Sequence, residues 1–256
     1  MSDQLHIGLV QSDLFWNNPL ANKNHFDALL TSLYDLDLIV LPEMFTTAFC
    51  INGNTETMNG ASVQWMLQKA KSLNAAVCGS LIIQEDNQRY NRFVWVTPNG
   101  EVEYYDKRHL FSLMGEGDQF AVGVERKLIN YKGWKICPQI CYDLRFPVYS
   151  RNDLGYDVLL YVANWPARRI VAWDKLLQAR AIENQSYVVG VNRVGEDINN
   201  ISFPGHSAVY DALGETLVFI AGEEKVEVAT LDKGLLTETR ERLPFLKDMD
   251  RFNLSS

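Results

Sequence analysis

The sequence predicts an α/β fold in layers, and three observations carry that prediction. Short apolar runs rich in Val, Ile and Leu alternate with segments of helical period through the first half of the chain. Pro98-Asn99-Gly100 is a strong hairpin signal, so the β-sheets are expected to be mixed rather than purely parallel. Apolar residues make up 47% of the 256 residues, enough to bury a sizeable core in one domain, residues 1–256.

The first half of the chain supplies the clearest elements. Asn18-Pro19 predicts the start of a helix, and the apolar face of this helix carries Phe26, Leu29, Leu30 and Leu33 at helical spacing. A second helix is expected over 61–73. The expected strands here are 7–11, 36–41, 76–83, 93–97 and 102–106.

From 107 to 127 no period dominates, and an irregular stretch of this length inside a compact domain is usually functional. Regular structure then resumes with a helix expected near 173–184 and a charged helical segment at the end. The expected strands of this half are 128–131, 134–140, 158–162, 186–191, 207–211, 216–220 and 226–231.

Three polar residues each lie directly after an apolar run: Glu43 in LPEMF, Lys107 in YYDKRHLF and Cys141 in PQICYDLRFP. The carboxyl ends of strands are where open α/β sheets place ligands and catalytic groups. Each residue also has a purely structural interpretation. Glu43 could start a helix or form an ion pair, Lys107 could be an exposed cation, and Cys141 could be a small buried apolar side chain.

Together the three groups form a chemically complete set. A thiol becomes a good nucleophile only as a thiolate, which needs a base or a nearby cation. A partly desolvated carboxylate is a competent base near neutral pH, so Glu43 is the expected proton acceptor. Lys107 would stabilise the thiolate and also the oxyanion that forms when the thiol attacks a carbonyl or nitrile carbon.

These residues lie in a chain that resembles the nitrilase superfamily of carbon-nitrogen hydrolases, whose triad is Glu-Lys-Cys in that order. Three of its segments resemble the omega-amidase branch, which hydrolyses the terminal amide of 2-oxo dicarboxylate monoamides. The superfamily resemblance rests on HIGLVQ, LPEMF, YDKRHLF, CYDLRFP, ARAIENQ and GHSAVYDALGE, and the branch resemblance on YDKRHLF, CYDLRFPVYSRN and LYVANWPARR.

The resemblance implies a four-layer α-β-β-α sandwich of the nitrilase type and a homodimer that pairs through helices. Apolar residues around Trp165 to Trp173 are compatible with such a dimer if they are exposed. The implied activity releases ammonia from substrates such as 2-oxoglutaramate or 2-oxosuccinamate by way of a thioester. Aliphatic amidase, N-carbamoyl hydrolase and nitrilase activities use the same triad and remain alternatives.

The resemblance also implies further site residues. Glu116, seven residues before Gly123, matches a second glutamate that touches the catalytic lysine. The backbone N–H of Tyr142 would hold the oxyanion together with Lys107. From their positions in the sequence, Asn164 and Trp165 are expected to border the pocket. Phe45, His109, Phe111 and Phe203 are further candidates to line it, with plain core packing as the alternative for each of these four. Two pairs are expected to be structural, namely Asp143 with Arg145 and Arg180 with Glu183.

Other classes of site fit less well. Cys137 and Cys141 lack a second Cys/His pair at zinc spacing and the four histidines are dispersed, so no metal is expected. GHSAV lacks the second glycine of a serine-hydrolase elbow, and neither a P-loop nor a dinucleotide fingerprint is present, so no cofactor is implied. A non-catalytic binding protein would have no chemical reason to keep Glu43, Lys107, Glu116 and Cys141 together.

The composition bears on partners and location. A formal net charge of −8 argues against a nucleic-acid or anionic-membrane partner and favours a small molecule. We expect a cytoplasmic protein without a membrane span, because no apolar window is long enough for one and the N-terminal residues lack signal-peptide features. The four cysteines are too few and too scattered for a disulfide framework and are expected to be reduced.

Overall fold

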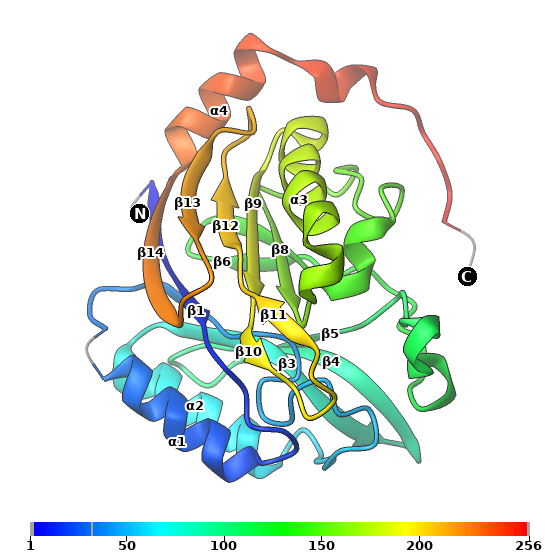
Figure 1. Cartoon of the computed structure of the whole chain (residues 1–256). Helices are drawn as coiled ribbons and strands as arrows, with labels where there is room; N and C mark the ends of the chain where they lie inside the picture. The colour runs from blue at the N-terminus through cyan, green and yellow to red at the C-terminus, as the bar shows by residue number, and fades with distance from the viewer. Residues whose placement is uncertain (1–2, 32, 255–256) are drawn as a thin grey trace.

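A computed structural model describes residues 3–31 and 33–254, which form two six-stranded sheets and four α-helices (Figure 1). The first sheet has the order β14 (Lys225–Asp232), β1 (Gln4–Gln11), β2 (Leu38–Val40), β3 (Ala76–Glu85), β4 (Gln88–Val96), β5 (Val102–Asp106). The second has the order β13 (Thr216–Ile220), β12 (Ser207–Tyr210), β9 (Tyr187–Asn192), β8 (Val158–Ala163), β7 (Trp134–Ile140), β6 (Ile129–Tyr131).

Both sheets are mixed, as the hairpin signal predicted. β1, β2 and β3 are parallel, and so are β7, β8 and β9, while the flanking strands pair antiparallel. The turn at Pro98-Asn99-Gly100 joins β4 to β5 with Val96 opposite Val102. Parallel strands need crossover connections, and these connections carry the helices.

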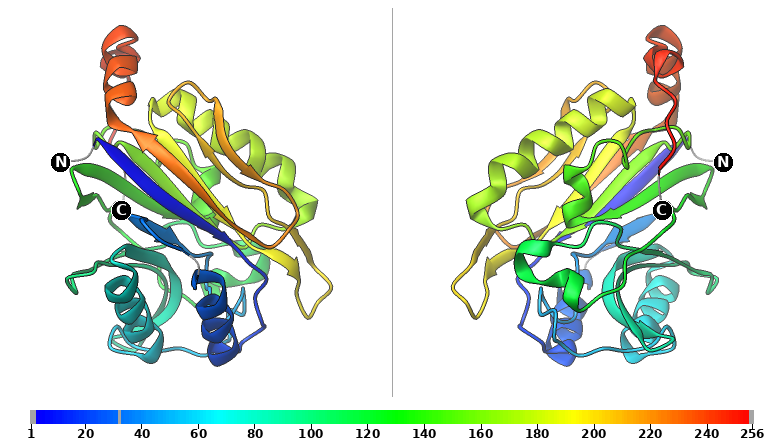
Figure 2. Two further views of the ribbon diagram at one scale, coloured as in Figure 1. Left: turned by 90° about the vertical axis from the view of Figure 1, so that its left-hand side faces the viewer. Right: turned by 90° about the vertical axis from the view of Figure 1, so that its right-hand side faces the viewer.

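The helices cover the two outer faces of the paired sheets, which gives the expected α-β-β-α order of layers (Figure 2). α1 (Pro19–Leu30) and α2 (Ala61–Leu73) pack on the first sheet, and α3 (Ile170–Asn184) packs on the second. α4 (Lys233–Arg242) follows β14 and projects from one end of the sandwich. The four-layer prediction is therefore confirmed.

Apolar side chains from both sheets form the core between them. Leu9 and Val40 of the first sheet belong to the same buried cluster as Ile136 and Leu160 of the second. Burying one such side chain stabilises the fold by about 1.5–3 kcal/mol, so this interface fixes how the sheets face each other. On the outer face Gly190 lets α3 approach β9, because a Cβ there would lie 2.5 Å from Leu177.

Local signals set most element ends. Asn18 caps α1, its side chain accepting a hydrogen bond of 3.1 Å from Ala21 N, and Pro19 occupies the first turn. The helix ends at Leu30, so Leu33 lies beyond it. β4 begins at Gln88 rather than 93, because Asp86 and Asn87 both have positive φ and form a tight hairpin with β3. The β10 (Val194–Glu196) and β11 (Ser202–Pro204) hairpin was not predicted.

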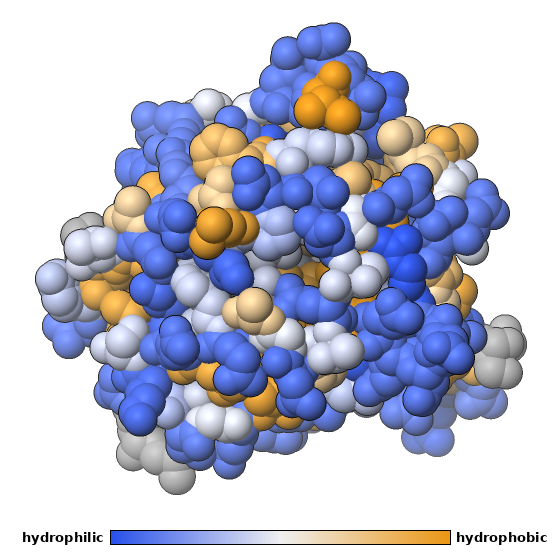
Figure 3. Space-filling view, turned by 90° about the horizontal axis from the view of Figure 1, so that it is seen from below, coloured by the Kyte–Doolittle hydropathy of each residue, from blue (hydrophilic) through white to orange (hydrophobic). Residues whose placement is uncertain are grey.

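The surface fits a protein with many charged side chains. The face seen from below in Figure 3 is mainly hydrophilic, with hydrophobic side chains in small separate groups. In the described part of the chain, no helix is long and apolar enough to cross a membrane. Trp165 and Trp173 are buried within the chain, so the expectation of an exposed apolar stretch there is wrong for both tryptophans, and they give no support to a dimer.

Candidate active site

Glu43, Lys107 and Cys141 come together although they follow strands of different sheets. Glu43 follows β2, Lys107 follows β5, and Cys141 follows β7 of the second sheet. Lys107 Nζ donates to Glu43 Oε1 over 2.9 Å, and both side chains are fully buried. Cys141 is partly exposed and its thiol interacts with both Glu43 and Lys107. The strands of both sheets are needed to assemble this group.

Glu116 is the second carboxylate on the lysine. It lies in η2 (Glu116–Asp118), a single turn in the irregular stretch, and its two oxygens accept from Lys107 Nζ at 3.0 and 2.8 Å. Phe111 N also donates to Glu116 Oε2 at 2.6 Å. Desolvation acts to lower the pKa of Lys107, but Glu116 and Glu43 outweigh it and the pKa is raised. The lysine is therefore a fixed cation at any ordinary pH.

Glu43 is held at both ends of its carboxylate. Asn91 Nδ2 donates to Oε1 at 2.8 Å, and Asn164 N donates to Oε2 at 2.8 Å. Asn164 Nδ2 also donates to the backbone oxygen of Glu43 at 2.6 Å. These donors replace the water hydrogen bonds that the buried carboxylate loses.

Cys141 occupies a strained turn between β7 and η3 (Cys141–Arg145). Its φ of 45° lies in the left-handed region, which a non-glycine residue rarely adopts. Desolvation raises the pKa of the thiol, nearby Glu43 raises it further, and Lys107 opposes them. The resting form is therefore the thiol, which must lose its proton when it attacks.

The side chain of Asp143 fixes this turn through hydrogen bonds, and its partners do not include Arg145, the expected one. The buried carboxylate accepts from Ile140 N at 2.9 Å and Tyr105 OH at 2.8 Å. It also binds His109, through the backbone N–H at 2.9 Å and ring Nδ1 at 2.8 Å. Arg145 instead stacks over the ring of Trp165, so the expected Asp143–Arg145 pair is wrong.

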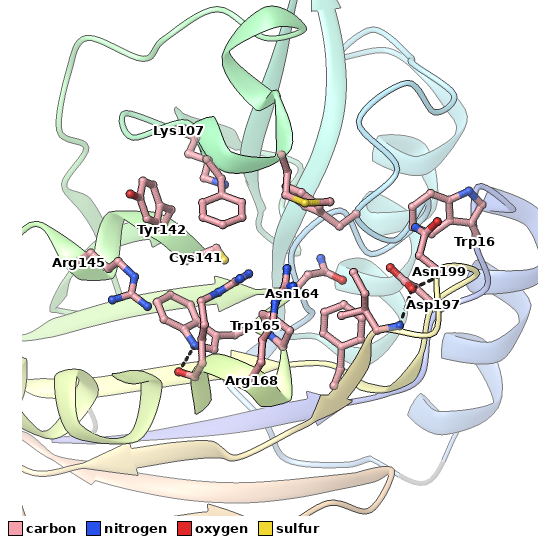
Figure 4. Close-up of a pocket in the computed structure, with 17 residues that line it drawn as sticks. Trp16, Lys107, Cys141, Tyr142, Arg145, Asn164, Trp165, Arg168, Asp197 and Asn199 are labelled. Carbon is pink, nitrogen blue, oxygen red and sulfur yellow. Dashed lines mark hydrogen bonds between the residues drawn. The ribbon is translucent and has the colours of Figure 1, made fainter. Parts of the chain in front are cut away.

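A pocket opens over the thiol (Figure 4). Lys107, Cys141, Tyr142, Asn164 and Trp165 line its inner part. The opposite wall comes from distant segments of the chain, with side chains from the β10–β11 hairpin facing those of the nucleophile turn. The remaining lining residues are Trp16, Phe49, Phe111, Met114, Arg145, Pro166, Arg168, Arg169, Asp197, Asn199, Ile201 and Phe203.

Three arginines give this pocket a positive side. Arg145, Arg168 and Arg169 all line it, and Arg169 lies over the ring of Phe111. Desolvation lowers the pKa of Arg169, and the neighbouring Arg168 and Arg145 lower it further. Neighbouring guanidinium groups provide a site for a carboxylate, because an anion relieves their mutual repulsion.

The geometry is matched by known proteins over the whole chain. The carbon-nitrogen hydrolase family model covers residues 8–241. The chain belongs to the carbon-nitrogen hydrolase family. It is 46% identical to omega-amidase YafV of Yersinia enterocolitica, with 98% of each chain covered. It is 34% identical to 2-oxoglutaramate amidase of Bacillus subtilis, with 95% of this chain and 96% of that one covered.

A solved structure supports the fold of this carbon-nitrogen hydrolase. XC1258 of Xanthomonas campestris, a CN-hydrolase superfamily protein, superposes with a TM-score of 0.96 at 43% identity, over 100% of each chain. That protein carries an arsenic adduct in its active site. The nitrilase-type sandwich that the sequence resemblance implied is confirmed.

Not every expected pocket residue of this hydrolase lines the pocket. Phe111, Tyr142, Asn164, Trp165 and Phe203 do. The described lining does not include Phe45 or His109. Phe45 packs on Phe26 and Trp65 beneath α1 and α2, because the backbone turns at Met44. His109 stacks on Phe146 at 3.7 Å and supports Asp143. The expected Arg180–Glu183 pair forms at 2.8 Å.

Several residues of the site in this hydrolase were not predicted from the sequence. Asn91 lies in the middle of β4, where a single polar residue gives no signal of its own. Arg168 and Arg169 follow Pro166 and Ala167 in a short turn that lines the pocket. These two adjacent basic residues after a strand were the sequence signal that could have indicated an anion-binding site. Within the described residues, no three His, Cys, Asp or Glu side chains are arranged to hold a metal ion.

Proposed function

We propose that this carbon-nitrogen hydrolase is a cysteine-dependent omega-amidase that converts small 2-oxo dicarboxylate monoamides to the dicarboxylic acid and ammonia. One observation carries the proposal: the Cys141 thiol, the Lys107 side chain that Glu43 and Glu116 hold, and three arginines line one pocket. The relatives named omega-amidase and 2-oxoglutaramate amidase support the choice of substrate class.

The first step forms the thioester. Glu43 takes the proton of Cys141 as the sulfur attacks the amide carbon. The oxyanion is held by the ammonium of Lys107 and the backbone N–H of Tyr142, and one such donor is worth about 2.7–4 kcal/mol in the transition state. The tetrahedral intermediate then collapses. Glu43 passes its proton to the leaving nitrogen, ammonia departs, and the acyl group stays on sulfur.

The second step clears the enzyme. A water molecule gives its proton to Glu43 and attacks the thioester carbon, and the same two donors hold the second oxyanion. Collapse breaks the C–S bond, and the proton on Glu43 returns to the sulfur. Lys107 need not change protonation state at any point, which agrees with its raised pKa. Glu116 keeps the lysine in place.

The arginines favour a substrate that carries a negative charge at the end opposite to its amide. A 2-oxo dicarboxylate monoamide carries a carboxylate at the end opposite to its amide. With the amide at Cys141, the carboxylate would meet Arg145, Arg168 or Arg169 on the positive side of the pocket. A neutral aliphatic amide or nitrile would leave these charges without a partner.

An ammonia-release assay tests the proposal. The substrates are 2-oxoglutaramate, 2-oxosuccinamate, glutamine, a neutral aliphatic amide, an N-carbamoyl amino acid and a nitrile. We expect kcat/KM to be highest for a 2-oxo monoamide and no turnover by Cys141→Ala, which should unfold at nearly the same temperature. A preference for the nitrile, the carbamoyl compound or the neutral amide would assign the protein to that other activity.

We also propose that the enzyme is one domain, acts as a homodimer and works in the cytoplasm. Cys50, Cys78, Cys137 and Cys141 are all free thiols, which supports a reducing compartment. The dimer rests on the family resemblance alone. Light scattering on the purified protein should give twice 29.2 kDa, and a mass of 29.2 kDa would refute the dimer.

A further inference from the structure

Asn91 is the residue that joins the two carboxylates of the site. It is fully buried on β4, and its Nδ2 group donates to Glu43 Oε1 at 2.8 Å and to Glu116 Oε1 at 3.0 Å. An amide nitrogen has two hydrogens, so one goes to each carboxylate. Asn91 is not part of the Glu-Lys-Cys set and does not line the pocket as described.

The orientation of this amide is fixed by its other contacts. Ser80 Oγ donates to Asn91 Oδ1 at 2.8 Å, and Met44 N donates to the same hydroxyl at 2.8 Å. The hydroxyl accepts from Met44 N on one lone pair and gives its single hydrogen to Asn91 Oδ1. The backbone oxygen of Asn91 also accepts from Lys107 N at 3.0 Å. If the amide were turned by 180°, Oδ1 instead of Nδ2 would face the carboxylates of Glu43 and Glu116, and it has no hydrogen to donate to them.

The contacts of Glu43 distinguish its two oxygens. Oε1 accepts from Lys107 Nζ and Asn91 Nδ2, which occupies both of its lone pairs. Oε2 accepts from Asn164 N at 2.8 Å and keeps one lone pair for the Cys141 proton. Asn91 therefore decides which oxygen of Glu43 carries the proton.

The charges of the cluster show why a neutral donor matters here. The charged or titratable groups that face Glu43 are Lys107 after β5, Glu116 in η2 and Cys141 in η3. Two carboxylates share one ammonium, so the buried group is one negative charge in excess. Without the Asn91 amide, no neutral donor would offset the repulsion between the carboxylates of Glu43 and Glu116. The pair would then bind a proton more readily.

We propose that Asn91 is a positioning residue that offsets the repulsion between the Glu43 and Glu116 carboxylates and leaves Oε2 of Glu43 as the acceptor of the incoming proton. It acts through Glu43 and Glu116 and does not touch the substrate. The proposal rests on the proposed function for its turnover assay, but the state of the Cys141–Glu43 pair can be read without any substrate.

The test compares Asn91→Asp and Asn91→Ala with Ser80→Ala as the matched control. Asn91→Asp keeps the volume and the acceptor for Ser80 but replaces the donor by a third carboxylate. Ser80→Ala disturbs the same buried spot and leaves both amide–carboxylate bonds in place. Thermal unfolding of each variant shows whether it folds.

We expect both Asn91 variants to lose about 10- to 100-fold in kcat at neutral pH with KM changed less than threefold. The acid limb of the kcat/KM profile should move to higher pH by about one unit, because the base is protonated more readily. Ser80→Ala should move this limb by much less. A wild-type pH profile in Asn91→Asp, or a loss confined to KM, would overturn the proposal.

Alkylation of Cys141 by iodoacetamide is the second readout, followed by mass spectrometry of the peptide that contains it. The rate should fall in both Asn91 variants below neutral pH, with Cys141→Ala as the blank. An unchanged alkylation rate would refute the positioning role. If the wild-type protein releases no ammonia from any 2-oxo amide, the proposed function fails while the alkylation result still decides the role of Asn91.

Discussion

Arg145, Arg168 and Arg169 bring three positive charges to the pocket of a protein whose formal net charge is −8. This local excess of positive charge costs free energy, because the three guanidinium groups repel one another. Arg145 and Arg169 reduce this cost by stacking on Trp165 and Phe111. The arrangement favours an anionic substrate over a neutral one of the same size.

Replacing Arg168 or Arg169 by Ala tests this preference. We expect KM for 2-oxoglutaramate to rise about tenfold, equal to about 1.4 kcal/mol, with a smaller change in kcat. The rate with a neutral aliphatic amide should stay within about twofold. Arg242→Ala, an exposed arginine on α4, is the control for loss of one charge. Equal losses with the charged and the neutral substrate would contradict the charge argument.

At the scale of elements, the loop from 107 to 123 controls the lysine. Gly123 N donates to the backbone oxygen of Lys107 at 2.9 Å, which closes the loop on itself. The closure needs a glycine, since a Cβ at this position would lie 1.9 Å from the backbone oxygen of Asp106. The loop therefore holds Lys107 from its backbone while Glu116 holds it from its side chain.

Gly123→Ala should displace the end of β5 and with it Lys107. We expect a loss of at least about 2 kcal/mol in the free energy of unfolding and a loss of activity greater than the stability change explains. Gly117→Ala is the matched control in the same loop, because its Cβ would meet nothing within 4 Å. Similar denaturation midpoints and rates for the two variants would refute the proposed closure.

Local sequence signals predicted much of the fold and part of the site. Glu43, Lys107 and Cys141 could be proposed as site residues because each directly follows an apolar run. Asn91 was not, since its role depends on packing between β4 and two loops that no local pattern describes. Phe45 lies outside the described pocket lining because the positive φ at Met44 turns the chain after Glu43. The β10–β11 strands have three residues each, too few for a visible alternation.

At the scale of the whole molecule, many acidic groups are buried in neutral form. Desolvation raises the pKa of Cys137 to about 12 and also raises the pKa values of Tyr105, Tyr156 and Tyr161. In the unfolded chain a thiol titrates near 8.5 and a phenol near 10. The stability that these groups contribute is complete below those values and is lost as the pH rises toward the folded pKa values.

The free energy of unfolding should therefore fall steadily above about pH 9. Each group that loses its proton only in the unfolded chain lowers the free energy of unfolding by about 1.4 kcal/mol per pH unit. The slope of the unfolding free energy against pH is measured from the midpoints of guanidinium chloride denaturation at pH 7.5, 9 and 10.5, in the presence of a reductant. Cys137→Ala should show a shallower slope than wild type over this range. A midpoint that stays constant to pH 10.5 would contradict the predicted loss.

The proposed base and the proposed nucleophile come from different sheets, and this division has a consequence during synthesis. Glu43, Asn91 and Lys107 follow or lie in strands of the first sheet, and Cys141 follows a strand of the second. A growing chain has made its base long before the sheets close around it. The proposed Glu43–Lys107–Cys141 group is therefore complete only after β7 has packed against the first sheet, and a fragment that ends before Cys141 lacks the thiol that the thioester needs.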